Sequence, residues 1–161
     1  MQKLKLIILS ISLLTTSCGK PDIFYGTAVD AELKQALDIS MRYLGHKDGF
    51  KHINSIDMVD SLDNCNVKLD DGSCATNGVC TKGFEGGTLT RRIKIVRSRW
   101  DAKNEYSKYA LLIHEVLHCA YDIKHATTKE SIMSATTPDK ISKDWFISTL
   151  SKDQQNYGFS K

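Results

Sequence analysis

The chain has little of several features that mark other classes of protein. It contains two prolines and ten glycines among 161 residues and no internal repeat, which excludes a low-complexity protein. Its formal net charge is only +3, and nothing in that balance suggests a nucleic-acid partner. The apolar run near the start, residues 6–14, is too short to span a membrane.

The first 17 residues have instead the pattern of a signal peptide. A short basic region with Lys3 and Lys5 precedes the apolar run, and small residues follow it up to Cys18. Small residues followed by cysteine resemble a bacterial lipobox, and this resemblance implies cleavage after residue 17 and lipidation of Cys18. Ordinary secretion, with cleavage nearby and an incidental Cys18, is the alternative.

The remaining 144 residues are a normal length for one domain with a sizeable core. We expect residues 18–28 to form a lipidated tether and residues 29–161 to form a single domain. Without Lys3 and Lys5 the formal charge falls to +1. We expect the protein to be a monomer. Its lipid should anchor it to a membrane of the bacterial cell envelope, with the domain facing the periplasm or the exterior.

The most informative stretch is a His-Glu-x-x-His motif inside residues 109–120, which are otherwise apolar nearly all round. In a helix, His114 and His118 lie on one face about 5–6 Å apart, so both imidazoles can bind one zinc ion. Glu115 is rotated by about 100° from His114 and is better placed to take a proton from water. The alternative is a chance pattern of core residues, but unpaired polar groups cost several kcal/mol in a core.

A third ligand has two candidates, His125 and Asp122. A helix that continued to His125 would carry it about 10 Å from His118, so the chain must turn back before His125 can share a metal. No glycine lies between the two histidines, and Asp122 is the residue best suited to a left-handed conformation there. If the helix continues instead, Asp122 itself could reach the metal.

The order of these motifs resembles that of the metzincin zinc endopeptidases. His125 follows the helix, and a Ser-Ile-Met sequence with Met133 follows His125. The resemblance implies that His125 is the third zinc ligand and that Met133 belongs to a Met turn beneath the metal. The family has five residues and a glycine between its second and third histidines, whereas six residues without glycine intervene here. Residues 29–138 are also similar to small predicted bacterial lipoprotein metallopeptidases with this longer spacing.

Hydrophobic periodicity predicts the other elements. We expect a helix at residues 29–44, strands at 50–58 and 89–96, an irregular segment at 64–87, a helix at 142–150 and a short last helix after it. Asp101 or Asn104 should cap the zinc-binding helix. The predicted fold class is α+β: a small mixed sheet over a long N-terminal helix, with the zinc-binding helix beneath it and a short C-terminal part with the Met turn.

Four cysteines remain when Cys18 is set aside, and an even number in an exported chain fits two disulfides. Four cysteines allow three pairings. We prefer Cys80–Cys119 with Cys65–Cys74, because the side chain of Cys119 points about 100° away from that of His118 and toward a neighbouring layer.

These features together predict a zinc-dependent endopeptidase that acts on extracytoplasmic proteins or peptides. Zn²⁺ would be bound by His114, His118 and His125, and Glu115 would be the catalytic base. Charged residues that alternate along residues 89–96 favour an edge strand of the sheet. The metzincin resemblance implies that this strand binds substrate, and a simple solvent-facing edge is the alternative. The alternatives are a non-catalytic, zinc-stabilised surface lipoprotein that binds a protein partner, and a hydrolase of cell-wall amides.

Overall fold

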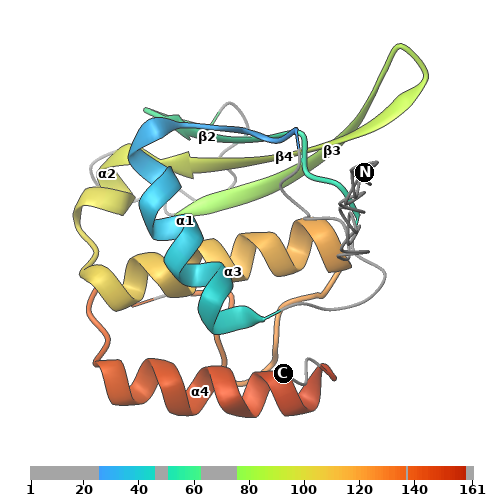
Figure 1. Ribbon diagram of the computed structural model, residues 1–161. Coiled ribbons are helices and arrows are strands. Elements are labelled where there is room, and N and C mark those ends of the chain that lie inside the picture. Colours follow the sequence, from blue (N-terminus) through green and yellow to red (C-terminus); the bar gives the residue numbers. More distant parts are fainter. Residues whose placement is uncertain (1–25, 46–50, 63–75, 137, 159–161) are drawn as a thin grey trace, which may run out of the picture.

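The computed structural model describes residues 26–45, 51–62, 76–136 and 138–158. The elements follow in the order β1 (Ala28–Val29), α1 (Ala31–Leu44), β2 (Ser55–Val59), β3 (Gly78–Glu85), β4 (Thr88–Val96), α2 (Arg97–Asp101), α3 (Glu105–Tyr121) and α4 (Lys143–Asn156). The sheet forms one layer, α1 and α3 pack beneath it, and α4 lies on the far side of α3 (Figure 1). This arrangement confirms the α+β class with a small mixed sheet.

The sheet has the strand order β1-β2-β4-β3, with β1, β2 and β4 parallel and β3 antiparallel to β4. The prediction that residues 89–96 form an edge strand is therefore wrong, because β4 lies between β2 and β3. The alternation of apolar and charged residues along β4 has another cause. Ile93 and Ile95 are fully buried against the helices, whereas Arg92 and Lys94 lie on the open face of the sheet. The edge strand is β3, which lies within the segment that we expected to be irregular.

Helix α1 forms where the apolar periodicity predicts it. Leu33, Leu37 and Leu44 recur at helical spacing and are buried against the rest of the core. The helix ends at Gly45, whose positive φ of 73° is a conformation that glycine adopts at no steric cost. The predicted helix at residues 29–44 is thus confirmed apart from its first two residues, which belong to β1 and the cap.

Helix α3 is buried on almost all sides because the sheet, α1 and α4 surround it. The Asn104 side chain caps its N-terminus by accepting a hydrogen bond from the backbone of Ser107, which decides between the two predicted caps. Its C-terminus lies at Asp122, which has a left-handed φ of 56° and is the single non-glycine residue with positive φ in the described part of the chain. The predicted left-handed residue is thus confirmed.

The C-terminal part contains one helix where the sequence suggested two. Helix α4 runs without a break from Lys143 to Asn156, and the Ser142 side chain caps its start. Phe146 is fully buried and makes an edge-to-face contact with Tyr43 of α1 at a ring distance of 5.1 Å. This contact joins the last helix to the first.

Several predictions concern residues outside the described ranges. These are the signal peptide at residues 1–17, the lipidated Cys18 with most of the tether, and the Cys65–Cys74 disulfide. They stay predictions. Within the described residues, no helix has both the length and the apolar character that a membrane crossing requires.

Candidate metal centre

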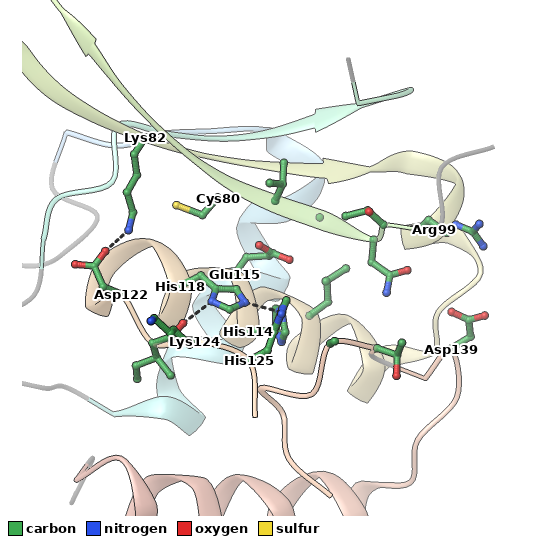
Figure 2. Close-up of a pocket in the computed structure, with 18 residues that line it drawn as sticks. Cys80, Lys82, Arg99, His114, Glu115, His118, Asp122, Lys124, His125 and Asp139 are labelled. Carbon is green, nitrogen blue, oxygen red and sulfur yellow. Dashed lines mark hydrogen bonds and ion pairs between the residues drawn. The ribbon is translucent and has the colours of Figure 1, made fainter. Parts of the chain in front are cut away.

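Three histidines converge beneath the sheet. His114 and His118 lie one turn apart on α3, and His125 comes from the segment that follows the helix. One ring nitrogen of each lies within 4.8 Å of the other two. Figure 2 shows the three rings gathered on one side of α3, with Glu115 between them and the sheet. The structure therefore brings together the three residues that the sequence predicts as metal ligands.

The reversal after α3 brings His125 back toward the helix. At the left-handed Asp122 the chain leaves the helix, and the backbone N–H of Ile123 donates to the carbonyl of Leu117 over 3.2 Å. The Asp122 carboxylate accepts hydrogen bonds from Lys51 and Lys82. Asp122 is thus engaged by two lysines, and it does not belong to the group of potential ligands that includes His125.

The hydrogen bonds of the histidines determine which nitrogen atoms face the centre. His114 Nδ1 lies 2.7 Å from the carbonyl oxygen of Ile132, and His118 Nδ1 lies 2.5 Å from that of Ile123. A carbonyl oxygen can only accept, so both Nδ1 atoms carry the proton in neutral rings. Each Nε2 then has a lone pair, and the Nε2 atoms of His114 and His118 are 3.0 Å apart.

Two lone pairs at this distance repel unless a cation lies between or beside them. A proton is a poor candidate because burial lowers the pKa of His114 to about 4 and also lowers the pKa of His118. Two ligand nitrogens of a tetrahedral zinc ion lie about 3.3 Å apart, given Zn–N bonds of roughly 2.0–2.1 Å. The donor set and its spacing therefore fit a divalent metal such as zinc.

The Ser131-Ile132-Met133 turn fixes the positions of two of the histidines by hydrogen bonds. The Ile132 carbonyl accepts from His114, and the Met133 carbonyl accepts from the backbone of Ala126, which directly follows His125. Met133 itself is fully buried. The turn thus contacts one histidine directly and fixes the backbone beside another.

A buried carboxylate on α4 anchors this turn. Asp153 is 3% exposed and accepts hydrogen bonds from the Ser131 hydroxyl over 3.0 Å and from the Ile132 backbone N–H over 2.7 Å. Burial raises the pKa of Asp153, and these hydrogen bonds act in the opposite direction. The connection runs from Asp153 through Ile132 to His114, so α4 helps to orient a ring that lies on another helix.

Glu115 lies between α3 and the start of β3. It is 3% exposed, and burial raises the pKa of Glu115 to about 8. A Cβ atom added at Gly78 would lie 3.0 Å from Glu115 Oε1 and 2.9 Å from Ile95 Cδ1. Only glycine leaves room for the carboxylate here without a shift of its neighbours. A nearby cation would lower the pKa of Glu115, because opposite charge favours the ionised form.

A cavity of about 940 Å³ opens beside the histidines and Glu115. Part of its wall is β3, which contributes Gly78, Val79, Cys80 and Lys82. The pair Lys82–Asp122 lies at one end, and Arg99 with Asp139 lies at the other (Figure 2). The cavity thus runs along the edge strand, with the candidate metal centre on its opposite wall.

The predicted disulfide between Cys80 and Cys119 is present and joins β3 to α3. Cys119 directly follows His118, and Cys80 is a residue of the cavity wall. The bond therefore fixes the edge strand against the helix that carries the histidines. Together with the Lys82–Asp122 ion pair, it holds this end of the cavity at two points.

Two residues of the site were not predicted from the sequence. Gly78 was assigned to an irregular segment, although an isolated glycine at the start of Gly-Val-Cys-Thr can signal a close approach to a strand. Asp153 lies in the region where we expected only a short last helix. Its role depends on residues about twenty positions earlier in the chain, and no local pattern reveals it.

We predict that Asp153→Ala weakens zinc binding by about 10–100-fold, as is typical when a residue that orients a ligand is removed. The loss should arise because the Ile132 carbonyl no longer holds His114 in one orientation. Asp144→Ala, an exposed carboxylate at the start of the same helix, is the matched control. Competition with a chelating dye measures both affinities, and equal values would contradict the role of Asp153.

The pKa shifts predict how pH affects the stability of metal-free protein. The folded-state pKa of His114 is about 4, below its ordinary 6.5, so the unfolded chain binds more protons and stability falls as pH drops through that window. The folded-state pKa of Glu115 is about 8, above its ordinary 4.5, so stability falls as pH rises from 4.5 to 8. Thermal stability should therefore be highest between these opposing effects, at about pH 4.5–6.5.

Thermal unfolding of chelator-treated protein across pH 4–9 checks this prediction. Glu115→Gln removes the titrating carboxyl, so it should abolish the decline at alkaline pH and leave the decline at acidic pH. The same alkaline decline in the parent protein and in Glu115→Gln would show that another group causes it.

Comparisons of the chain with protein-family models, with curated proteins and with solved structures found no match. The resemblance to metzincins therefore stays a hypothesis that rests on the sequence motifs. What is shown is a group of three histidines that could hold a metal ion, of which His114 is buried, His118 is half-buried and His125 is exposed, beside a buried glutamate and a cavity.

Proposed function

We propose that this chain is a zinc-dependent endopeptidase that cleaves extracytoplasmic proteins or peptides. The observation that carries the proposal is the pair of Nε2 lone pairs 3.0 Å apart, with His125 beside them and Glu115 one residue along the same helix. A metal ion would satisfy both lone pairs at once, one on the buried His114 and one on the half-buried His118.

Zinc is the metal that the donor set favours. Three neutral imidazoles suit a borderline-soft ion, and no carboxylate or thiolate joins their group within the described ranges. Structural zinc sites usually have four protein ligands, whereas three leave a position open to the cavity. Zinc bound there would supply a Lewis acid for the scissile carbonyl and lower the pKa of a water molecule toward 7.

Glu115 is the proposed general base. Its carboxylate lies on the cavity wall between the histidines and β3, where it can take a proton from water and pass it to the leaving amine. The close fit against Gly78 restricts its movement, so the proton acceptor keeps one position. The low exposure of Glu115 keeps competing bulk water away.

The first part of the edge strand β3, residues 78–82, is the proposed binding site for the peptide. It lines the cavity with residues 78–80 and Lys82, and within the described residues its outer edge pairs with no other strand. An extended peptide could add to this edge by main-chain hydrogen bonds, which favour a polypeptide over a small substrate. The substrate strand that we expected at residues 89–96 is thus reassigned to the preceding strand of the same hairpin.

We predict that Glu115→Gln keeps the metal but lowers turnover by at least about 10²–10⁴-fold, because the glutamine amide cannot accept the proton. His114→Ala should instead lose the metal. Zinc content per chain and the cleavage of unstructured proteins and peptides, with a chelator control, measure the two effects separately.

The same experiment separates the alternatives. A zinc-stabilised binding protein would hold zinc, cleave nothing as wild type and show no difference in Glu115→Gln. A hydrolase of cell-wall amides would cleave cell-wall peptides and leave polypeptides intact. Either result would overturn the proposed endopeptidase, as would cleavage by Glu115→Gln at the wild-type rate.

The proposed place of action is the bacterial cell envelope, with the protein as a lipid-anchored monomer. This part of the proposal rests on the signal-like residues 1–17 and on Cys18, which precede the described part of the chain.

A further inference from the structure

The hairpin of β3 and β4 has an apolar pair at its end. Phe84 is 77% exposed and Leu89 is 39% exposed, and the two residues are paired across the strands. Among the described residues, the one other exposed large hydrophobic side chain is Ile147 on α4. We call residues 84–89 the hairpin tip. Two exposed apolar side chains thus lie side by side on one projection and form a small apolar patch.

The apolar pair belongs to the face of the sheet that packs on the helices. Side chains alternate along β3, so Phe84 points to the same side as Lys82 and Cys80, which reach α3 through an ion pair and a disulfide. The hairpin continues past the end of α3 without a helix beneath it (Figure 1). The core-facing side of the sheet thus extends beyond the core and ends in Phe84 and Leu89.

Positive charge lies behind the hairpin tip. The hairpin carries Lys82, Arg91, Arg92 and Lys94. Glu85 pairs with Arg92 and Asp122 pairs with Lys82, so these four cations and their two acidic partners keep an excess of positive charge. Arg91 and Lys51 lower the pKa of Lys82 after the effect of burial, so the cations are close enough to repel one another. An apolar tip with basic residues behind it is complementary to a lipid bilayer, in which hydrocarbon lies beneath anionic headgroups.

The chain enters the domain from the same side. The strands β1, β2 and β4 are parallel. In their register, Ala28 of β1 pairs with Ser55 of β2, and Ser55 pairs with Arg92 of β4. Gly26 and Thr27, the described residues before Ala28, therefore lie toward the end of the sheet at which the hairpin extends. From Arg92 to Gly87 the hairpin continues for five residues, or about 17 Å at about 3.4 Å per residue.

The proposed anchor is close enough to place this end of the sheet at a membrane. Eight residue steps separate Cys18 from Gly26, and a fully extended chain of that length spans at most about 26–29 Å. A lipid at Cys18 thus keeps the entry point within that distance of the bilayer, and the hairpin projects in the same direction. We propose that the hairpin tip rests on an anionic lipid bilayer, with Phe84 and Leu89 in the interface and the basic residues near headgroup phosphates.

This inference rests on the proposed lipid anchor and is independent of the proposed peptidase. None of the residues 84–89 lines the cavity. Cleavage of a soluble peptide can therefore be measured on the same samples, so that a failure of the peptidase proposal and a failure of this one are distinguishable.

The test uses tryptophan as a depth probe. Phe84→Trp and the control Ile147→Trp are purified from membranes of a host that processes the chain and are reconstituted into vesicles of phosphatidylethanolamine and phosphatidylglycerol. Part of the lipid carries bromine on the acyl chains near the headgroup. The parent protein, with Trp100 and Trp145, gives the background emission. Interfacial apolar side chains lie about 5–10 Å deep, within reach of such a quencher.

Emission from position 84 should shift to shorter wavelength and lose intensity in brominated vesicles, and emission from position 147 should do neither. Vesicles of phosphatidylcholine should weaken the effect at position 84, because they lack anionic headgroups. Equal quenching at positions 84 and 147 would overturn the proposal. Equal quenching at position 84 in neutral and anionic vesicles would overturn the assignment of an anionic surface.

Discussion

Two imidazole nitrogens with lone pairs 3.0 Å apart impose the main constraint on this structure. Their orientation follows from the carbonyls of Ile132 and Ile123, which fix the protons of His114 and His118 on the opposite ring nitrogens. Burial lowers the pKa of both rings and so keeps them neutral. A cation bound between the two nitrogens would remove their mutual repulsion, and the other contacts around α3 fix the positions of the histidines that could bind it.

Contacts from three separate parts of the chain maintain that arrangement. Asp122 reverses the chain after α3 and is held by Lys51, which precedes β2, and by Lys82 of β3. Asp153 reaches from α4 to the turn under His114, and Gly78 admits the carboxylate of Glu115 beneath β3. The fold thus surrounds one helix with elements that each fix one part of its polar face, which is a common way to preorganise a site.

The sequence predicted the features that depend on local pattern. The helical spacing of Leu33 and Leu37 located α1, and the run around His114 located α3. Asp122 could be predicted because only a few residue types tolerate a left-handed conformation. The strand order could not be predicted in this way, since it depends on pairing between distant segments. β3 was missed because an edge strand covers little core, and its residues from Thr81 onward are exposed. Asp153 was missed because its partners lie in another part of the chain.

The central claim is that the three histidines bind zinc and leave one position open. X-ray absorption at the zinc edge tests it most directly, because the distances and identities of ligand atoms are read without a substrate. The account predicts three nitrogen neighbours at about 2.0–2.1 Å and one further oxygen neighbour. A sulfur neighbour at about 2.3 Å would place the metal on cysteine, and a fourth imidazole would close the site. Either result, or purified protein that binds no zinc, would contradict the account.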